Sequence, residues 1–153
     1  MPQDTLQLEK FLPYRLSVTS NLVSQAIANA YVTLFDLTIA EWRVIAVIAE
    51  GSGITQQEVC VLTRMDKVTV SRAAIALTER GLIDRTPNPR DGRSHILALS
   101  AEGAELYGNV APKALELETR IFGALDPADI ARLSAILEQV ADAAEKLVSG
   151  AGG

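Results

Sequence analysis

Three residues that could perform covalent chemistry lie within five positions of one another, namely Asp91, Ser94 and His95. A serine, a histidine and an acid form a nucleophilic triad only when their side chains converge. We expect these three on one short turn and strand, where successive side chains alternate between faces, which disfavours a triad. The single histidine and the single cysteine, Cys60, are too few for a structural zinc site. We therefore predict no enzymatic activity, no catalytic residue and neither a metal nor a cofactor.

A second chemical pattern is the uneven distribution of charge. The chain has 14 Lys and Arg residues against 19 Asp and Glu, a net charge of −5. Between residues 60 and 100 there are seven basic and four acidic residues, a local charge of +3, whereas the remaining residues carry −8. Because phosphate binding depends on the charge of one face rather than on net charge, this segment predicts a phosphate-binding surface.

Length and composition indicate a globular protein. A chain of 153 residues with 48% hydrophobic residues can bury a core without disulfides, and one cysteine fits a reducing compartment. The N-terminus lacks a basic start followed by an apolar run, so we expect no signal peptide. Apolar runs are shorter than the ~20 residues of a membrane span. We expect a cytoplasmic protein that does not bind membranes.

Capping signals and apolar periodicity predict six helices. Thr38 and Thr55 each begin a T-x-x-E capping box, Asp66 is a third N-cap, and Gly81 suits a left-handed helix end. A break is expected at Gly51–Gly53. The predicted helices are residues 12–34 with Pro13 in the first turn, 39–50, 56–62, 67–80, 100–125 with a bend at Pro112, and a last helix that begins at Asp126–Pro127.

Between the fourth and fifth helices the apolar period changes from helical to alternating. Residues 82–86 and 94–99 are strand candidates, and the Pro-, Gly- and Arg-rich residues 87–93 form the turn of a β-hairpin. Two short helices joined by residues 63–65 and followed by a hairpin form a winged helix–turn–helix. The helical wheel places Val70, Ala73, Ala74 and Leu77 inward, and leaves Val68, Thr69, Arg72 and Ile75 or Ala76 outward.

The outward half of the fourth helix is small, hydroxylated and basic. Such a surface can approach base edges and anchor to phosphates at the same time, and Val68 is suited to contact a thymine methyl. The sequence M-D-K-x-T-V-S-R…L-x-x-R-G-L-I-x-R-x-P-x-P-x-D-x-R…L-x-L-S-x-x-G resembles the MarR family of bacterial winged-helix repressors. The similarity extends to LPYRLS, LTIAEWRVIAVIAE, Pro112 and LDPADIARLSAILE.

The resemblance implies a mainly α protein with a small β-wing that acts as a homodimer on a palindromic site in double-stranded DNA. The fourth helix would enter successive major grooves, and Arg93 of the wing would enter the minor groove. Asp91 would orient Arg72 or Arg93 rather than contact DNA. Gly92 departs from the basic or bulky residue common in the family, which predicts a more flexible wing tip.

We therefore predict a sequence-specific transcriptional regulator, a repressor released by a small ligand. Residues 1–36 would form an N-terminal dimerisation helix, 37–99 the DNA-binding lobe, 100–148 the C-terminal dimerisation helices and 149–153 a flexible tail. The predicted DNA contacts are Thr55, Gln56, Gln57, Lys67, Val68, Thr69, Ser71, Arg72, Arg90 and Arg93.

The family resemblance also places an effector pocket near the first, second and fifth helices. Tyr14, Arg15, Ser20 and Trp42 are the candidates by region, and Arg15 could pair with a small anionic or aromatic effector. Two alternatives remain open. One is a redox switch through Cys60, although the reactive cysteine of peroxide-sensing relatives lies in the first helix, which here has none. The other is a winged-helix module that binds protein.

Overall fold

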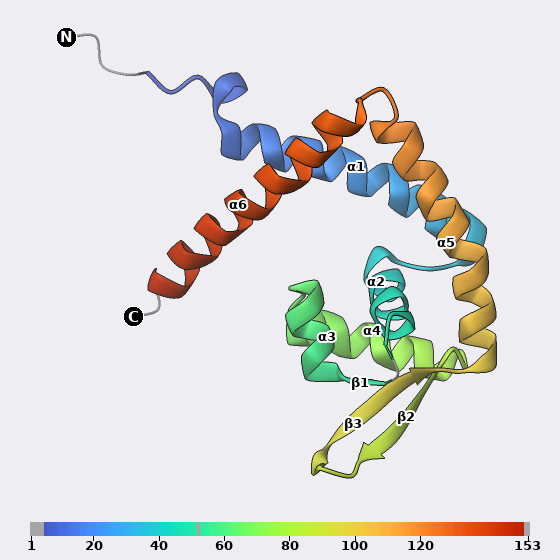
Figure 1. Ribbon diagram of the computed structural model, residues 1–153. Helices are drawn as coiled ribbons and strands as arrows, with labels where there is room; N and C mark the ends of the chain where they lie inside the picture. The colour runs from blue at the N-terminus through green and yellow to red at the C-terminus, as the bar shows by residue number, and fades with distance from the viewer. Residues whose placement is uncertain (1–4, 52, 152–153) are drawn as a thin grey trace. The chain divides into compact units, whose positions relative to one another are not determined.

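The computed structural model describes residues 5–51 and 53–151, which form six α-helices, one short 3-10 helix and three strands (Figure 1). This confirms the predicted mainly α fold with a small β-wing. The residues divide into two compact units, 1–114 and 115–153, and α5 runs from the first into the second. The elements are η1 (Leu8–Lys10), α1 (Leu12–Phe35), α2 (Ile39–Ala49), β1 (Ile54–Thr55), α3 (Gln56–Thr63), α4 (Lys67–Glu79), β2 (Ile83–Asn88), β3 (Asp91–Leu99), α5 (Ala101–Phe122) and α6 (Pro127–Ala151).

The core of the first unit lies where α2, α3 and α4 pack together and against the sheet. Each fully buried aliphatic side chain contributes about 1.5–3 kcal/mol through the hydrophobic effect. Fully buried members include Leu37, Val44, Ile45, Val59, Val70, Leu77, Ile83, Leu97 and Val110.

The predicted helix starts are confirmed, because local side chains satisfy the free N–H groups. The Thr38 hydroxyl accepts from the Glu41 N–H at 3.1 Å, and the Glu41 carboxylate accepts from the Thr38 N–H at 2.8 Å. This capping box also gives the buried Glu41 its partner. The Asp126 carboxylate accepts from the Asp129 N–H at 2.9 Å and caps α6.

Helix α4 ends in a Schellman motif at the predicted glycine. Gly81 has φ +72°, its N–H donates to the Thr78 carbonyl, and the Leu82 N–H donates to the Leu77 carbonyl. Because Leu82 completes this helix end, β2 begins at Ile83 rather than at the predicted Leu82.

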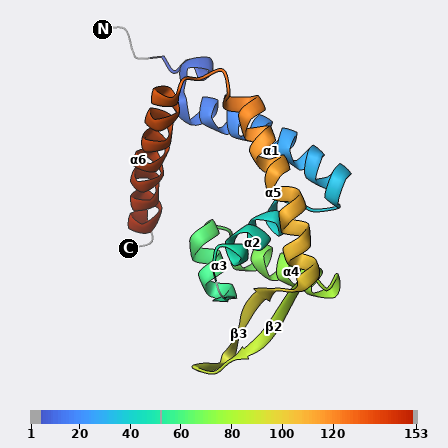
Figure 2. The same cartoon turned by 45° about the vertical axis from the view of Figure 1, so that its right-hand side comes forward.

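The sheet is antiparallel with strand order β1-β3-β2, and its β2–β3 hairpin projects from the helices in both views (Figures 1 and 2). The predicted seven-residue turn was wrong, since only Pro89 and Arg90 separate the two strands. Pro87 can lie within β2 because an edge strand does not need every N–H for pairing. The short strand β1 was not predicted, and it pairs Ile54 with Leu97.

Two helix ends also differ from the predicted boundaries. Helix α5 ends at Phe122 rather than near Leu125, and residues 123–125 form a turn. Helix α6 continues to Ala151, so residues 149–151 of the predicted tail are helical. Ser52 of the predicted break and residues 152–153 of the predicted tail lie outside the described residues. Among those described, no helix combines the length and the hydropathy needed to cross a membrane.

Candidate nucleic-acid interface

The N-terminal end of α4 is held by its cap residue. The Asp66 carboxylate accepts from the Thr69 N–H at 2.8 Å and from the Thr69 hydroxyl at 2.8 Å. These hydrogen bonds lower the pKa of Asp66 below its ordinary value, and the bond from the backbone N–H has the larger effect. The Thr69 hydroxyl proton is thus directed at the cap, which leaves the methyl group and the oxygen lone pairs of Thr69 for a partner.

Helix α4 has the two faces that the sequence predicts. Val70, Ala73, Ala74 and Leu77 are all buried. Lys67 and Arg72 are exposed, Val68 is 57% exposed and Ile75 48%, while Ser71 is half-buried. The exposed arc therefore combines two cations with two apolar side chains along the outer surface of one helix.

Helix α3 precedes α4 across a tight turn. The Thr55 hydroxyl caps α3 by accepting from the Glu58 N–H at 3.1 Å, and it also donates to the Glu58 carboxylate. In a capping box the Glu58 carboxylate would accept from the Thr55 backbone N–H, whereas here it accepts from the Thr55 hydroxyl. Gln57 is exposed at the start of α3, and Gln56 beside it is half-buried.

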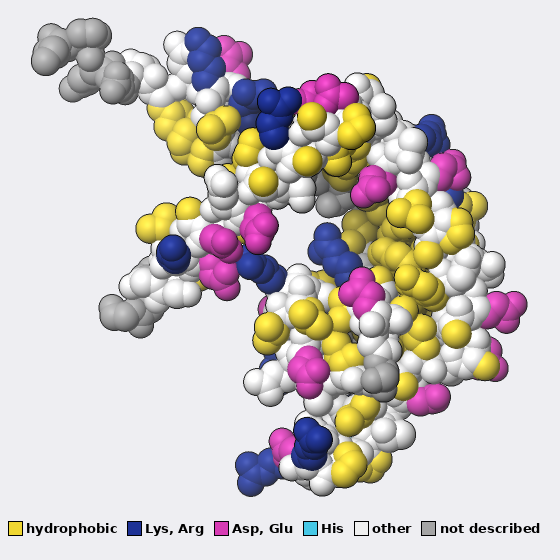
Figure 3. Space-filling model, in the orientation of Figure 1, with side chains coloured by type: hydrophobic (Ala, Val, Ile, Leu, Met, Phe, Trp, Pro, Cys, Tyr) yellow, Lys and Arg dark blue, Asp and Glu magenta, His cyan; other side chains and the backbone are white. Residues whose placement is uncertain are grey.

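The tip of the β2–β3 wing is held by side chain–backbone hydrogen bonds. The Asn88 carboxamide accepts from the Arg90 N–H at 3.0 Å and donates to the Ser94 hydroxyl at 2.9 Å. The Asp91 carboxylate accepts from the Arg93 N–H at 3.0 Å. Arg90 and Arg93 are exposed, and Figure 3 shows basic side chains at the free end of the hairpin.

This network refines the predicted role of Asp91. The contact of its carboxylate is with the backbone of Arg93 and not with a guanidinium, so it fixes the chain direction at Arg93. Gly92 has open space around the position of a Cβ. Asn88 and Ser94 were placed in the predicted hairpin, but their hydrogen bonds at its tip were not predicted. An Asn before a two-residue Pro–Arg turn was the signal that could have indicated the role of Asn88.

The residues considered for other chemistry lie on the wing and on α3. His95 is exposed on β3, Cys60 is half-buried on α3, and the redox role of Cys60 stays a prediction. Within the described ranges, no group of three or more His, Cys, Asp or Glu residues could hold a metal ion.

The four predicted effector residues lie in two different settings. Tyr14, Arg15 and Ser20 are exposed along α1. Trp42 is half-buried on α2, stacks on Tyr107 of α5 with ring centroids 5.7 Å apart, and lies tilted against Tyr31 at 5.6 Å. Burial raises the pKa of Tyr31. The aromatic cluster thus joins α1, α2 and α5 within the first unit.

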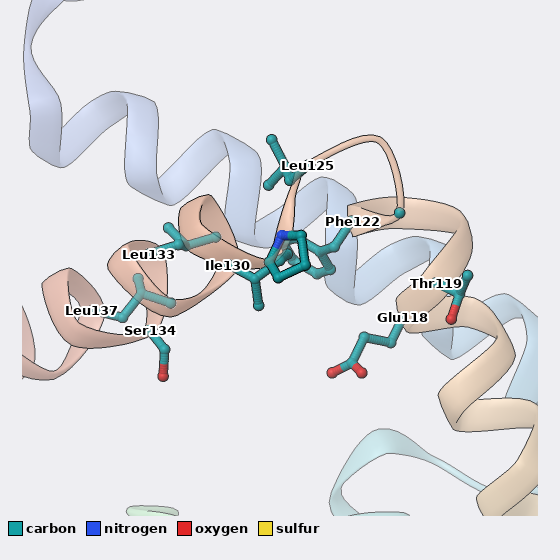
Figure 4. Close-up of a pocket in the computed structure, with 10 residues that line it drawn as sticks. Glu118, Thr119, Phe122, Leu125, Ile130, Leu133, Ser134 and Leu137 are labelled. Atoms are coloured by element: carbon teal, nitrogen blue, oxygen red, sulfur yellow. The ribbon is translucent and has the colours of Figure 1, made fainter.

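The second unit contains an apolar groove of about 560 Å³ between the end of α5 and the start of α6 (Figure 4). Phe122 lies at the end of α5, Leu125 lies on the connecting turn, and Ile130, Leu133 and Leu137 come from a single face of α6. No effector candidate lines this groove, because all of its lining residues belong to residues 118–137.

The capped helix–turn–helix and its hairpin define this chain as a winged-helix protein. Residues 35–94 match the model of the MarR family. The HTH-type transcriptional repressor IacR of Pseudomonas putida is 28% identical over 105 residues, which cover 69% of this chain and 63% of that protein. These matches confirm the predicted resemblance to the MarR family, and the chain spans less than two thirds of the length of the first curated relatives it matches.

Solved structures have the same fold. A Cys-to-Ser mutant of MarR from Escherichia coli, complexed with operator DNA, has a TM-score of 0.77 and 25% identity over 90% of this chain and 99% of that chain. BpsR of Bordetella bronchiseptica, whose DNA binding is regulated by 6-hydroxynicotinic acid, has a TM-score of 0.83 and 22% identity over 90% of this chain and 98% of that chain.

Proposed function

We propose that this protein is a cytoplasmic, sequence-specific DNA-binding transcriptional regulator. The observation that carries the proposal is the exposed, basic and partly apolar arc of α4 beside a wing with two exposed arginines. Direct base contacts and phosphate contacts require this combination on one surface. The match of residues 35–94 to the model of the MarR family supports the same function.

Each exposed group has a specific chemical task in this proposal. Arg72 is long enough to donate a bidentate pair to guanine, and Val68 offers an apolar contact to a thymine methyl. Lys67 contacts phosphate as a point charge, with Thr55, Gln57 and Ser71 as polar neighbours on the same approach. Arg93, fixed through its backbone by Asp91, enters a narrow minor groove, where negative potential attracts a guanidinium.

The protein acts as a homodimer on a palindromic operator. Exposed apolar side chains outside the core support association with a second copy of the chain, since contiguous exposed apolar surface marks an interface. Such side chains occur on α1, where Leu12 is 70% exposed, and separately on α6, where Leu147 is 76% exposed. A two-fold dimer repeats the α4 surface on two half-sites one helical turn apart.

Operator occupancy blocks transcription, and a small anionic or aromatic effector releases the protein. The regulation of BpsR by 6-hydroxynicotinic acid supports effector control. Trp42 and Tyr107, which are stacked and half-buried, offer aromatic surface for such a molecule. A ligand releases DNA only by binding better to the form with unsuitable spacing of the two α4 helices.

The direct test is fluorescence anisotropy of the purified protein with its own upstream intergenic DNA and with a scrambled control at several salt concentrations. We expect tighter binding to the native sequence and a steep decrease of affinity with salt, because phosphate contacts release counterions. A folded dimer that binds neither DNA would refute the proposal and favour a winged-helix module that binds protein.

A further inference from the structure

The C-terminal end of α4 makes a contact that its place in the basic segment does not predict. Arg80, the residue after α4, extends its guanidinium to the C-terminal end of α1. Its Nη1 donates to the Asp36 carbonyl at 2.7 Å, and its Nη2 faces the Phe35 carbonyl at 3.4 Å. Both helix ends belong to residues 1–114, so the contact lies within one compact unit.

The end of α1 needs a cation from elsewhere in the chain. Its last turn contains no basic residue, and Asp36 caps it in the left-handed conformation with φ +53°. The N–H groups of Asp36 and Leu37 donate to carbonyls one turn back. The carbonyl groups of Phe35 and Asp36 are left directed outward. A planar guanidinium can bond two adjacent carbonyls, and its charge suits the negative end of a helix dipole.

The same end of α4 is also fixed to α5. The Ser100 hydroxyl donates to the Gly81 carbonyl at 2.6 Å and accepts from the Gly103 N–H at 3.0 Å. A Cβ at Gly103 would collide with the Leu82 carbonyl, so α5 begins in close contact with the end of α4. Helix α4 is therefore anchored to two neighbouring helices at its C-terminal end, while the outer face of its N-terminal half is exposed.

We propose that Arg80 is a positioning residue that sets the direction of α4 relative to α1, and that it is not a phosphate contact. This inference rests on the proposed function, because the direction of α4 determines how its exposed residues meet the operator. A shift at the end of α1 is passed to α4 through the two-carbonyl clamp formed by Arg80, Phe35 and Asp36.

Two other roles for Arg80 make different predictions. A phosphate contact would strengthen binding to every DNA sequence and would contribute about one unit to the salt slope. A purely stabilising contact would change the folded fraction without changing the sequence preference of the folded protein. The positioning role changes sequence preference alone, because a misdirected α4 still presents the same charge to phosphates.

The test compares Arg80→Ala with Arg43→Ala, an exposed arginine of α2 in the same unit, using the full chain, its upstream intergenic DNA and the scrambled control. We expect Arg80→Ala to weaken native-sequence binding about tenfold, within the range of 5- to 150-fold usual for coupled sites. Affinity for scrambled DNA and the salt slope should match the wild type, and Arg43→Ala should be unchanged. Equal losses on both DNAs with a flatter salt slope would overturn the positioning role.

A second variant guards against unfolding. Arg80→Lys keeps the charge but replaces the planar fork by a single point donor, so it should keep the fold and still lose part of the sequence preference. Wild-type preference in Arg80→Lys would overturn the two-carbonyl clamp.

Hydrogen exchange separates this inference from the proposed function, since it needs no DNA. Loss of the clamp should speed amide exchange at Asp36 and Leu37 in Arg80→Ala and not in Arg43→Ala. Unchanged exchange would refute the clamp even if the protein binds its operator. Faster exchange in a protein without sequence preference would refute the regulator and leave only the contact.

Discussion

Helices α4 and α6 are both apolar on one side, but they use that side differently. In α4 the apolar residues Val70 and Leu77 are completely buried against the rest of the lobe. In α6 the corresponding residues stay accessible, with Ile136 53% exposed, Leu137 46% and Val140 45%. A one-sided apolar helix is stable in water only when another surface covers that side.

The contrast separates a region that closes its own core from one whose apolar stripe stays accessible and which the proposed homodimer would cover. The winged-helix lobe completes its core with strands and helices of its own chain, so its folding should depend on side chains such as Leu97. The stripe on α6 should depend on a second copy. Substitutions in the two regions should therefore change different measured quantities, stability in one and association in the other.

The largest expected effect is on stability, from a truncation in the lobe. Leu97→Ala removes a fully buried side chain of β3 and leaves a cavity, so it should lower the free energy of unfolding by about 2–5 kcal/mol. Urea denaturation followed by circular dichroism measures this change. Leu62→Ala is the matched control, because Leu62 is 66% exposed on α3 and should change stability by less than about 0.5 kcal/mol. Equal effects of the two truncations would contradict the assigned core.

The next effect is on association. Leu137→Asp places a charge in the apolar groove of α6 and should raise the dimer dissociation constant by about 30- to 1,000-fold, as for other central interface residues. Sedimentation velocity measures it, and circular dichroism should show intact helices. Gln139→Asp introduces the same charge on the opposite face of α6 and should leave the dimer intact. A stable Leu137→Asp dimer would place the interface elsewhere.

Local sequence signals predicted the helix starts and the two faces of α4 well. Caps such as Thr38 and Asp66 act over three residues, and the inward face of α4 follows from the helical period alone. The family resemblance supplied the roles of the wing residues, which spacing alone could not give. Their DNA contacts remain predictions.

Features that depend on distant partners were missed or misjudged. Strand β1 consists of two residues and exists because β3 offers an edge about forty positions later. The turn was predicted too long because residues 87–93 are rich in Pro, Gly and Arg, whereas β2 is an edge strand and can include Pro87. Arg80 was counted with the basic segment, since no local pattern indicates that its partners lie 44 and 45 residues earlier.

Within the lobe, Arg72 and Arg93 should affect DNA binding differently from Lys67. Arg93→Ala and Arg72→Ala should each weaken native-sequence binding by about 1–3 kcal/mol if they read the site, as measured by anisotropy. Lys67→Ala should weaken binding to native and scrambled DNA alike and reduce the salt slope by about one. Unchanged affinity in both arginine variants would remove these two residues from the interface.

The smallest expected effect is the pH dependence of the cap on α4. The pKa of Asp66 is lower in the folded protein than its ordinary value, because the Thr69 N–H and hydroxyl bond the carboxylate. Its contribution to stability should be fully present above the ordinary pKa of Asp and should be lost as the pH falls through the lower, folded value. Asp66→Asn can still accept a hydrogen bond from the Thr69 N–H but does not titrate, so it should reduce the loss of stability in this acidic range. Thermal unfolding of both proteins between neutral and acidic pH measures the difference, with Asp84→Asn on the exposed face of β2 as the control. Parallel pH profiles for wild type and Asp66→Asn would mean that the cap does not depend on the charge of Asp66.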